Sequence, residues 1–201
     1  GSAATGSSRT LIQDGWNTML ETMQADGDAS SVSLTHFQNL LSVCRRQKRE
    51  TDAIRIYNIV WQLCDHGWPD LCGPQEKLRP NTVFVNGVIE TMCVAGDLKA
   101  ARAVYLQMVD KGVPSSKDTL HLLADWHLIG EAAKPGHLQT ALDFIDIMLS
   151  REFQGDYRLY VRRLMGLGAW PKAMELIDRL QAAAWLPVDT VDITFYSGVL
   201  S

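Results

Sequence analysis

No run of apolar residues in this sequence is long enough to cross a membrane as a helix. Its 201 residues nowhere approach the roughly 20 consecutive apolar positions that such a helix needs. Positive charge is also scarce, because 19 Lys and Arg stand against 23 Asp and Glu, which gives a formal net charge of −4. Proteins that bind nucleic acids through phosphates need a local excess of Lys and Arg. The charge balance therefore argues weakly against a nucleic-acid partner, although a basic stripe on an acidic protein would still allow one.

The four cysteines form no C-x-x-C pair, which argues against a zinc ribbon or a thioredoxin-like site. Cys44 and Cys93 fall within apolar helical patterns, where a free thiol packs as a small hydrophobic side chain. Cys64 and Cys72 flank a loop, and both a disulfide and a pair of reduced thiols fit that position.

Residue patterns that carry catalysis are missing as well. The sequence has no phosphate-binding glycine loop and no G-x-S-x-G elbow. None of the five histidines stands at metal-ligand spacing from another His or Cys on one helix face. His121 and Asp125 are i, i+4 neighbours, a spacing more typical of a surface hydrogen bond than of a catalytic pair. We therefore expect no catalytic residue, no metal and no cofactor.

One packing pattern recurs along the chain. A small residue is followed by bulky apolar residues at i+3, i+4 and i+7, which places all four on one stripe of a helix. The Ala that starts the pattern has no side chain beyond Cβ, so a neighbouring helix can approach closely. A weaker copy has Trp in the small position, at Trp16. The four clear copies are Ala53, Ile56, Tyr57 and Val60; Ala101, Val104, Tyr105 and Met108; Ala141, Phe144, Ile145 and Met148; and Ala173, Leu176, Ile177 and Leu180.

Each clear stripe is preceded by a second helical pattern and a turn. Before the second stripe the turn is Gly96 followed by Asp97, which suits a helix end and the N-cap of the next helix. Gly168 ends the corresponding helix of the fourth unit, and residues 131–135 form an insert before Gly136 in the third. The sequence predicts helices at about 10–24, 34–47, 51–66, 82–95, 98–112, 117–130, 137–151, 155–168, 171–184 and from about 190.

Helix pairs of this kind bury their apolar stripes only by stacking on neighbouring pairs. We therefore expect an all-α fold, a right-handed α-solenoid of antiparallel helix pairs with about four repeats plus flanking half-repeats. Residues 1–8 contain only Gly, Ser, Ala and Thr and predict a flexible tail, not a signal peptide. Residues 9–201 form one domain, with a long surface insertion at 67–80. The segment 195–200 repeats the pattern of 84–89, so we expect a partner or further chain to cover the last helix.

The second unit carries a specific motif. Residues 80–98 read PNTVFVNGVIETMCVAGDL and continue into a Met108-x-x-x-Gly112 end. With its early Asn, its Ala-Gly turn and its Met-x-x-x-Gly end, this unit resembles a pentatricopeptide repeat. The tetratricopeptide repeat is the second choice. The resemblance implies single-stranded RNA binding with one base read per repeat. It implies that Asn86 and Ser116 contact the edge of a base, with a preference for a pyrimidine, and that Val83 stacks on that base.

The matching first-helix positions of the other units are uncommon choices for base reading in that family. They are Gln38, His121 and Arg158. Two basic groups are candidates for contacts with phosphates or with an acidic protein partner, and a solvated helix end is the alternative for both. These groups are Arg45, Arg46, Lys48 and Arg49 in the first unit, and Arg158 and Arg162 in the fourth.

Six tryptophans are many for a chain of this length. We expect Trp61, Trp126 and Trp170 to pack between helices. Trp68 and Trp185 stand at loops or helix ends, where an exposed aromatic side chain can anchor a protein partner.

The sequence therefore favours a non-catalytic scaffold or adaptor that binds protein partners within a large assembly. The alternative is a single-stranded RNA-binding protein of organellar RNA metabolism or translation. The resemblance implies a location in a chloroplast or mitochondrion, in a mature form without its targeting peptide.

Overall fold

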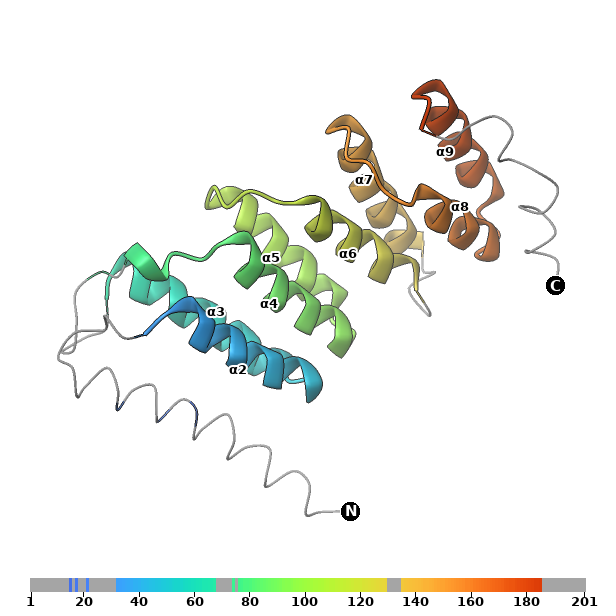
Figure 1. Ribbon diagram of the computed structural model, residues 1–201. Helices are drawn as coiled ribbons and strands as arrows, with labels where there is room; N and C mark the ends of the chain where they lie inside the picture. Colours follow the sequence, from blue (N-terminus) through green and yellow to red (C-terminus); the bar gives the residue numbers. More distant parts are fainter. Residues whose placement is uncertain are drawn as a thin grey trace, which may run out of the picture. The chain divides into compact units, whose positions relative to one another are not determined.

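A computed structural model describes residues 32–67, 74, 76–129 and 135–185, together with Gly15, Asn17 and Glu21. This part of the chain is built from α-helices and one short 3-10 helix, and it contains no strand, so the predicted all-α class is confirmed for it (Figure 1). The helices are α2 (Leu34–Arg46), α3 (Glu50–Asp65), η2 (Glu76–Leu78), α4 (Thr82–Ala95), α5 (Leu98–Asp110), α6 (Lys117–Leu128), α7 (Pro135–Ser150), α8 (Tyr157–Gly166) and α9 (Trp170–Ala182).

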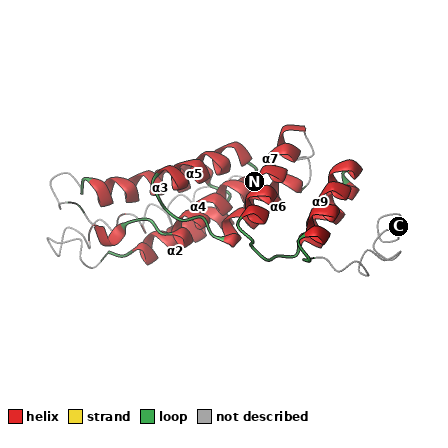
Figure 2. Ribbon diagram, turned by 90° about the horizontal axis from the view of Figure 1, so that it is seen from above, coloured by secondary structure: helices red, strands yellow, loops and turns green. Residues whose placement is uncertain are grey.

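The chain divides into two compact units, residues 1–119 and 120–201. The first unit holds α2 to α5 and the start of α6, and the second holds the rest of α6 with α7 to α9. In the first unit, α4 packs against α2, α3 and α5. Viewed from above, α2 and α4 lie in one layer and α3 and α5 in the other (Figure 2). In the second unit, α8 packs against α9.

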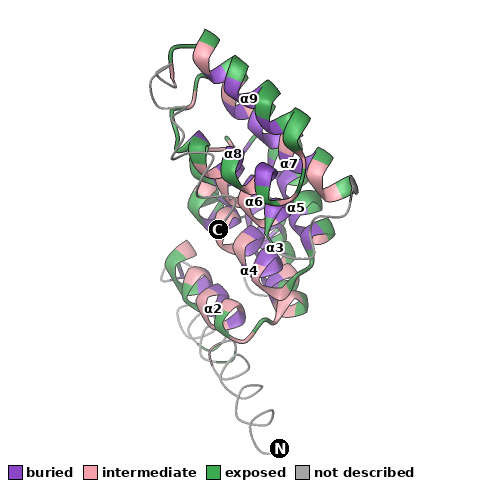
Figure 3. Cartoon of the chain, turned by 90° about the vertical axis from the view of Figure 1, so that its right-hand side faces the viewer, coloured by how far each residue is buried: buried purple, intermediate pink, exposed green. Residues whose placement is uncertain are grey.

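All four clear apolar stripes are buried. The Ala that begins each stripe is 0% exposed in α3, α5, α7 and α9 alike, and the bulky members that follow it are also buried. Helix α9 shows the consequence, with buried residues along one side and exposed residues along the other (Figure 3). The i, i+3, i+4, i+7 pattern therefore correctly identified the buried side of α3, α5, α7 and α9.

Short polar motifs set the ends of α4 and α5. The side chain of Asn81 accepts a hydrogen bond from the Phe84 amide at 2.9 Å and caps α4. Gly96 follows α4 with a φ of 89°, a left-handed conformation that glycine adopts without steric cost. Asp97 then caps α5 by accepting from the Ala100 amide at 2.9 Å. This turn has the form that the sequence predicted.

The start of α7 differs from the prediction. Residues 131–135 were expected to form an insert before Gly136, but the helix already begins at Pro135. Proline suits the first position of a helix, because its φ is already helical and the amide hydrogen that it lacks would have no partner there. The proline therefore opens the helix and does not belong to the loop.

Part of the predicted insertion at 67–80 packs into the first unit. The 3-10 turn η2 contacts α3, and its Leu78 is fully buried. The remaining expectations at the ends and in the loops lie outside the described residues. They are the tail 1–8, the Trp16 stripe of the first predicted helix, Trp68, Cys72, and the helix from about 190.

Within the described ranges, no helix combines the length and the apolar character that a membrane crossing requires.

Candidate binding sites

The structure brings two of the predicted base-contact residues together through Thr119. The Thr119 hydroxyl donates to Oδ1 of Asn86 at 2.7 Å, which joins α4 to the first turn of α6. Ser116 and Thr119 also cap α6 reciprocally, since the Ser116 amide lies 3.1 Å from the Thr119 hydroxyl and the Thr119 amide donates to Ser116 Oγ at 3.2 Å. Thr119 itself is fully buried. The carbonyl oxygen of Asn86 and the hydroxyl of Ser116 are therefore engaged inside the protein.

Val83, the predicted stacking residue, is on the surface of α4 and is 68% exposed. It precedes Asn86 by three residues, so the two side chains share one side of the helix. Glu90 follows on the same side and forms an ion pair with Arg45 of α2. This side of α4 consequently presents one apolar side chain, one amide and one neutralised carboxylate.

The first basic group contains two ion-paired arginines. Arg45 pairs with Glu90 across α2 and α4, and Arg49 pairs with Asp52 at 2.5 Å within the start of α3. Arg46 and Lys48 are exposed. Lys48 has a φ of 52°, so the turn between α2 and α3 uses a strained lysine where the turn between α4 and α5 uses Gly96.

The second basic group lies on α8. Arg158 and Arg162 are both exposed and are four residues apart, so they share a side of the helix as predicted. Their neighbour Arg163 points elsewhere and forms an ion pair with Asp125 of α6, as well as a hydrogen bond of 3.2 Å to the Asp125 carbonyl.

The remaining first-helix positions have different surroundings. Gln38 is half-buried on α2. His121 is bonded through Nδ1 to the hydroxyl of Tyr160, and the two rings stack with centroids 5.5 Å apart. Burial raises the pKa of the Tyr160 hydroxyl, so this contact holds a neutral phenol. The histidine thus contributes to the packing of α6 on α8.

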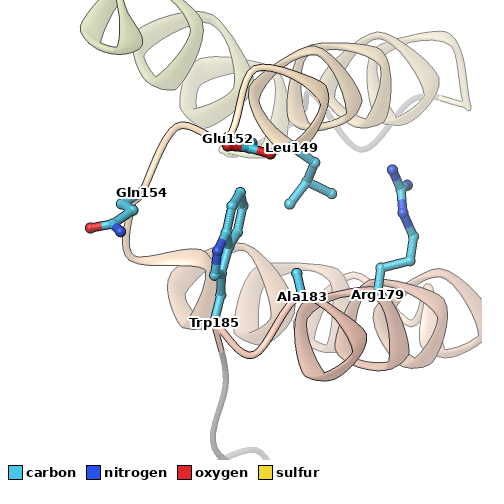
Figure 4. A pocket seen from close by; sticks show the side chains of 6 residues that line it. All are labelled: Leu149, Glu152, Gln154, Arg179, Ala183 and Trp185. Atoms are coloured by element: carbon cyan, nitrogen blue, oxygen red, sulfur yellow. The ribbon is translucent and has the colours of Figure 1, made fainter.

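Trp185 lies in the turn that follows α9, after Ala183 and Ala184, near the helix end where the sequence placed it. Its ring stacks on Tyr157 of α8, with centroids 5.7 Å apart and planes inclined by 24°. It also lines a cavity of about 410 Å³ between the ends of α7 and α9 (Figure 4). Of the other tryptophans, Trp61 is buried and Trp126 is half-buried, whereas Trp170 is 41% exposed and was wrongly expected to pack between helices.

The cysteines of the described part are buried thiols. Burial raises the pKa of Cys44 to about 11 and that of Cys93 to about 12, and it also raises the pKa of Cys64. Cys44 and Cys93 have no exposed surface, so the prediction that they pack as small hydrophobic side chains is confirmed. Cys64 is also a free thiol.

Two histidines from different helices meet, a contact that residue spacing along one helix does not predict. Nδ1 of His127 and Nδ1 of His137 are 3.0 Å apart, and His127 is buried. Among the described residues, no group of three or more His, Cys, Asp and Glu side chains is arranged to hold a metal ion.

Thr119, Glu152 and Arg179 were not among the site residues predicted from the sequence. The Ser116-x-x-Thr119 spacing is a capping pattern and could have revealed the first. The other two line the cavity beside Trp185 only because two helices end next to each other.

No protein-family model matches this sequence, and a comparison with curated proteins finds no relative.

Proposed function

We propose that this chain is a non-catalytic scaffold whose helices form a right-handed α-solenoid of antiparallel pairs, similar in design to pentatricopeptide repeat proteins. It binds protein partners within a large assembly of a chloroplast or mitochondrion. The organelle follows from the resemblance of residues 80–98 to that family, and it is an inference by analogy.

Cross-helix ion pairs support the stacked architecture. Each of four pairs joins one α-helix to the α-helix after next, or, for Lys111, to the residue that directly follows that helix, and each pair lies within one compact unit. Stacked pairs place first helices beside first helices and second helices beside second helices, which would produce such contacts. The pairs are Arg45 with Glu90, Asp65 with Lys111, Asp125 with Arg163, and Asp146 with Arg179.

The contact of Asn86 with Thr119 is the observation that favours a protein partner over RNA. A base read by Asn86 and Ser116 would have to compete with the 2.7 Å bond to Thr119 and with the cap of α6. Breaking a bond to a buried group costs about 1–3 kcal/mol. In the basic groups, Arg45 and Arg49 are already paired with carboxylates, which reduces the positive charge left for phosphates.

Exposed apolar side chains on the second helices are consistent with protein docking. Leu106 and Val109 of α5 are exposed at i, i+3, and Trp170 and Met174 of α9 are exposed at i, i+4. Side chains at these spacings share one side of a helix. Apolar pairs of this kind serve as contacts in protein interfaces more readily than in RNA grooves, which rely on positive charge.

The alternative function is single-stranded RNA binding. The exposed Val83 would stack on a base, and Arg46, Lys48, Arg158 and Arg162 are exposed for phosphate contacts. Four scattered cations on a chain of net charge −4 would give weak binding with a steep dependence on salt.

Titration with a mixed-sequence single-stranded RNA separates the two functions. Fluorescence anisotropy at about 50 mM and about 200 mM salt measures both the affinity and its salt slope. We expect no saturable binding at the lower salt concentration. Micromolar affinity that falls steeply with salt, and that is lost in an Arg158→Glu, Arg162→Glu double variant, would replace the scaffold function with the RNA one.

The protein-binding side is tested by comparing two matched substitutions on different sides of α5. Leu106→Glu and Gln107→Glu each place one additional carboxylate at an exposed position, but only residue 106 shares a side of the helix with Val109. Affinity capture followed by quantitative mass spectrometry should recover a partner with wild-type chain and with Gln107→Glu, but less of it with Leu106→Glu. Equal recovery with all three chains would remove this surface from the proposal.

A further inference from the structure

The cavity at the ends of α7 and α9 has a repeated construction. After each helix comes a residue with positive φ, Glu152 at 55° and Ala184 at 57°. The amide of the next residue then bonds back into the helix, Phe153 to the Met148 carbonyl at 3.0 Å and Trp185 to the Leu180 carbonyl at 2.9 Å. The cavity therefore lies where the C-terminal turns of two helices come together.

Two helix C-termini make the electrostatic potential in this cavity more negative. The last carbonyl groups of a helix carry the equivalent of about half a negative charge, which favours cations nearby. The carboxylate of Glu152 adds a full negative charge to the lining. Arg179 is the opposing charge in the lining, and its exposed ion pair with Asp146, 2.5 Å away, reduces the positive charge that it presents to the cavity.

The indole of Trp185 forms an aromatic wall. It projects from the end of α9 toward the loop that carries Glu152, and Leu149 and Ala183 provide apolar surface beside it (Figure 4). Stacking on Tyr157 holds the ring in this orientation. An aromatic face attracts a cation that lies over it, and Arg is the most frequent partner. The same chain holds one such contact in its first unit, where Nζ of Lys111 lies 4.2 Å from the ring centroid of Trp61.

We propose that this cavity is a docking site for an arginine side chain of a partner protein. The guanidinium stacks on Trp185 and donates hydrogen bonds to the Glu152 carboxylate, while its alkyl stem lies along Leu149. Arginine fits better than lysine, because its planar group stacks on an aromatic ring and bonds a carboxylate through two nitrogens at once. The proposal rests on the scaffold function, since it names the chemistry that one partner would present.

Side-chain mimics test the site directly. The probe is N-acetyl-arginine methylamide, and its matched control is the citrulline analogue, which has almost the same shape but no charge. Two-dimensional NMR follows the signal of the Trp185 indole Nε1–H group, which is identified by its disappearance in Trp185→Phe. We expect the arginine probe to shift this signal in a saturable manner, and the citrulline probe to leave it in place. Equal shifts with both probes would overturn the proposal.

Two variants with opposite expected effects sharpen this test. Glu152→Gln keeps the size of the side chain and should weaken binding of the probe by about threefold to fivefold. Arg179→Met removes the competing charge and should strengthen binding by about twofold to threefold. Asp143→Asn removes an exposed carboxylate of α7 that does not line the cavity, and should leave the affinity unchanged. Loss of affinity in Asp143→Asn equal to that in Glu152→Gln would indicate only a general charge effect and would refute the site.

Uridine monophosphate serves as the nucleic-acid probe in the same experiment. The negative lining should repel its phosphate, so we expect no shift of the Trp185 signal. A shift larger than that of the arginine probe would assign the cavity to nucleotides and overturn the proposal. The scaffold function fails separately, through tight RNA binding in the anisotropy titration, and that result would leave the arginine probe data unaffected.

Discussion

Thr119→Val is the substitution that most directly tests how the protein uses Asn86. Valine keeps the shape of threonine but has no hydroxyl, and Thr119 is fully buried. The change removes the bond to Asn86 Oδ1 and the bond from the Ser116 amide. A lost capping bond costs about 1 kcal/mol, and an unpaired acceptor costs about 1–3 kcal/mol. Because Asn86 and Ser116 are only half-buried, water can replace part of both bonds, and we expect a loss of about 2 kcal/mol.

Urea denaturation followed by far-ultraviolet circular dichroism measures this free energy of unfolding. Thr119→Ser is the matched control, since it keeps the hydroxyl and loses one buried methyl group, at a cost of about 1 kcal/mol. A double-mutant cycle with Asn86→Ala should give a coupling energy of about 1 kcal/mol between residues 86 and 119. The free energy of unfolding of Thr119→Val could instead lie within about 0.5 kcal/mol of the wild-type value, or the double-mutant cycle could give no coupling energy. Either result would mean that Thr119 does not constrain Asn86, and it would refute the reasoning against base reading.

Three further substitutions or conditions test the fold. Ala101→Glu places a carboxylate at a fully buried position of α5 and should cost about 3 kcal/mol or more in urea denaturation, whereas Ala103→Glu, exposed on the same helix, should change stability by less than about 0.5 kcal/mol. Similar free energies of unfolding for the two variants would refute the assignment of Ala101 to the buried stripe. Burial raises the pKa of Cys93 from 9.0 to about 12, so the folded state keeps the thiol proton to higher pH than the unfolded state. The contribution of the protonated thiol to the free energy of unfolding is fully present below pH 9.0 and should be lost as pH rises from 9.0 toward about 12. A pH series of unfolding curves checks this, and the decline should be less steep in Cys93→Ala. Gly96→Ala places a Cβ at a φ of 89° and should destabilise the protein by about 1 kcal/mol, although no atom lies within 4 Å of the new Cβ. The same change at Gly166, which is helical and equally open, should instead stabilise by about 0.5 kcal/mol, and thermal melts distinguish the two signs.

The sequence allowed the helices and their buried sides to be predicted because both depend on local spacing. An Ala followed by bulky residues at i+3, i+4 and i+7 defines a stripe without reference to the rest of the fold. The turn at Gly96 and Asp97 was predictable for the same reason, since each residue acts on the backbone next to it.

Contacts between helices were not predictable in this way. Arg163 and Asp125 are 38 residues apart, and Arg45 and Glu90 are 45 apart, so their meeting depends on the angle and register of the packed helices. Trp170 shows that residue spacing alone also fails at the end of a helix. It lies three residues before Ala173 and therefore in line with the stripe, but it is the first residue of α9. Helical side chains lean toward the N-terminus, so a residue at the first position has no preceding turn of its own helix to cover, and Trp170 is 41% exposed.

Ion pairing changes what the net charge of the chain says about its ligand. A formal charge of −4 counts every lysine and arginine equally, yet Arg45, Arg163 and Arg179 each neutralise a carboxylate of a neighbouring helix. A ligand therefore meets the remaining charges, and these differ between places on the surface. Arg158 and Arg162 on α8 present positive charge, whereas the cavity beside Trp185 presents Glu152 and two helix C-termini. An anionic ligand and an arginine side chain would thus bind at different places, which is why the RNA titration and the arginine probe give independent answers about this protein.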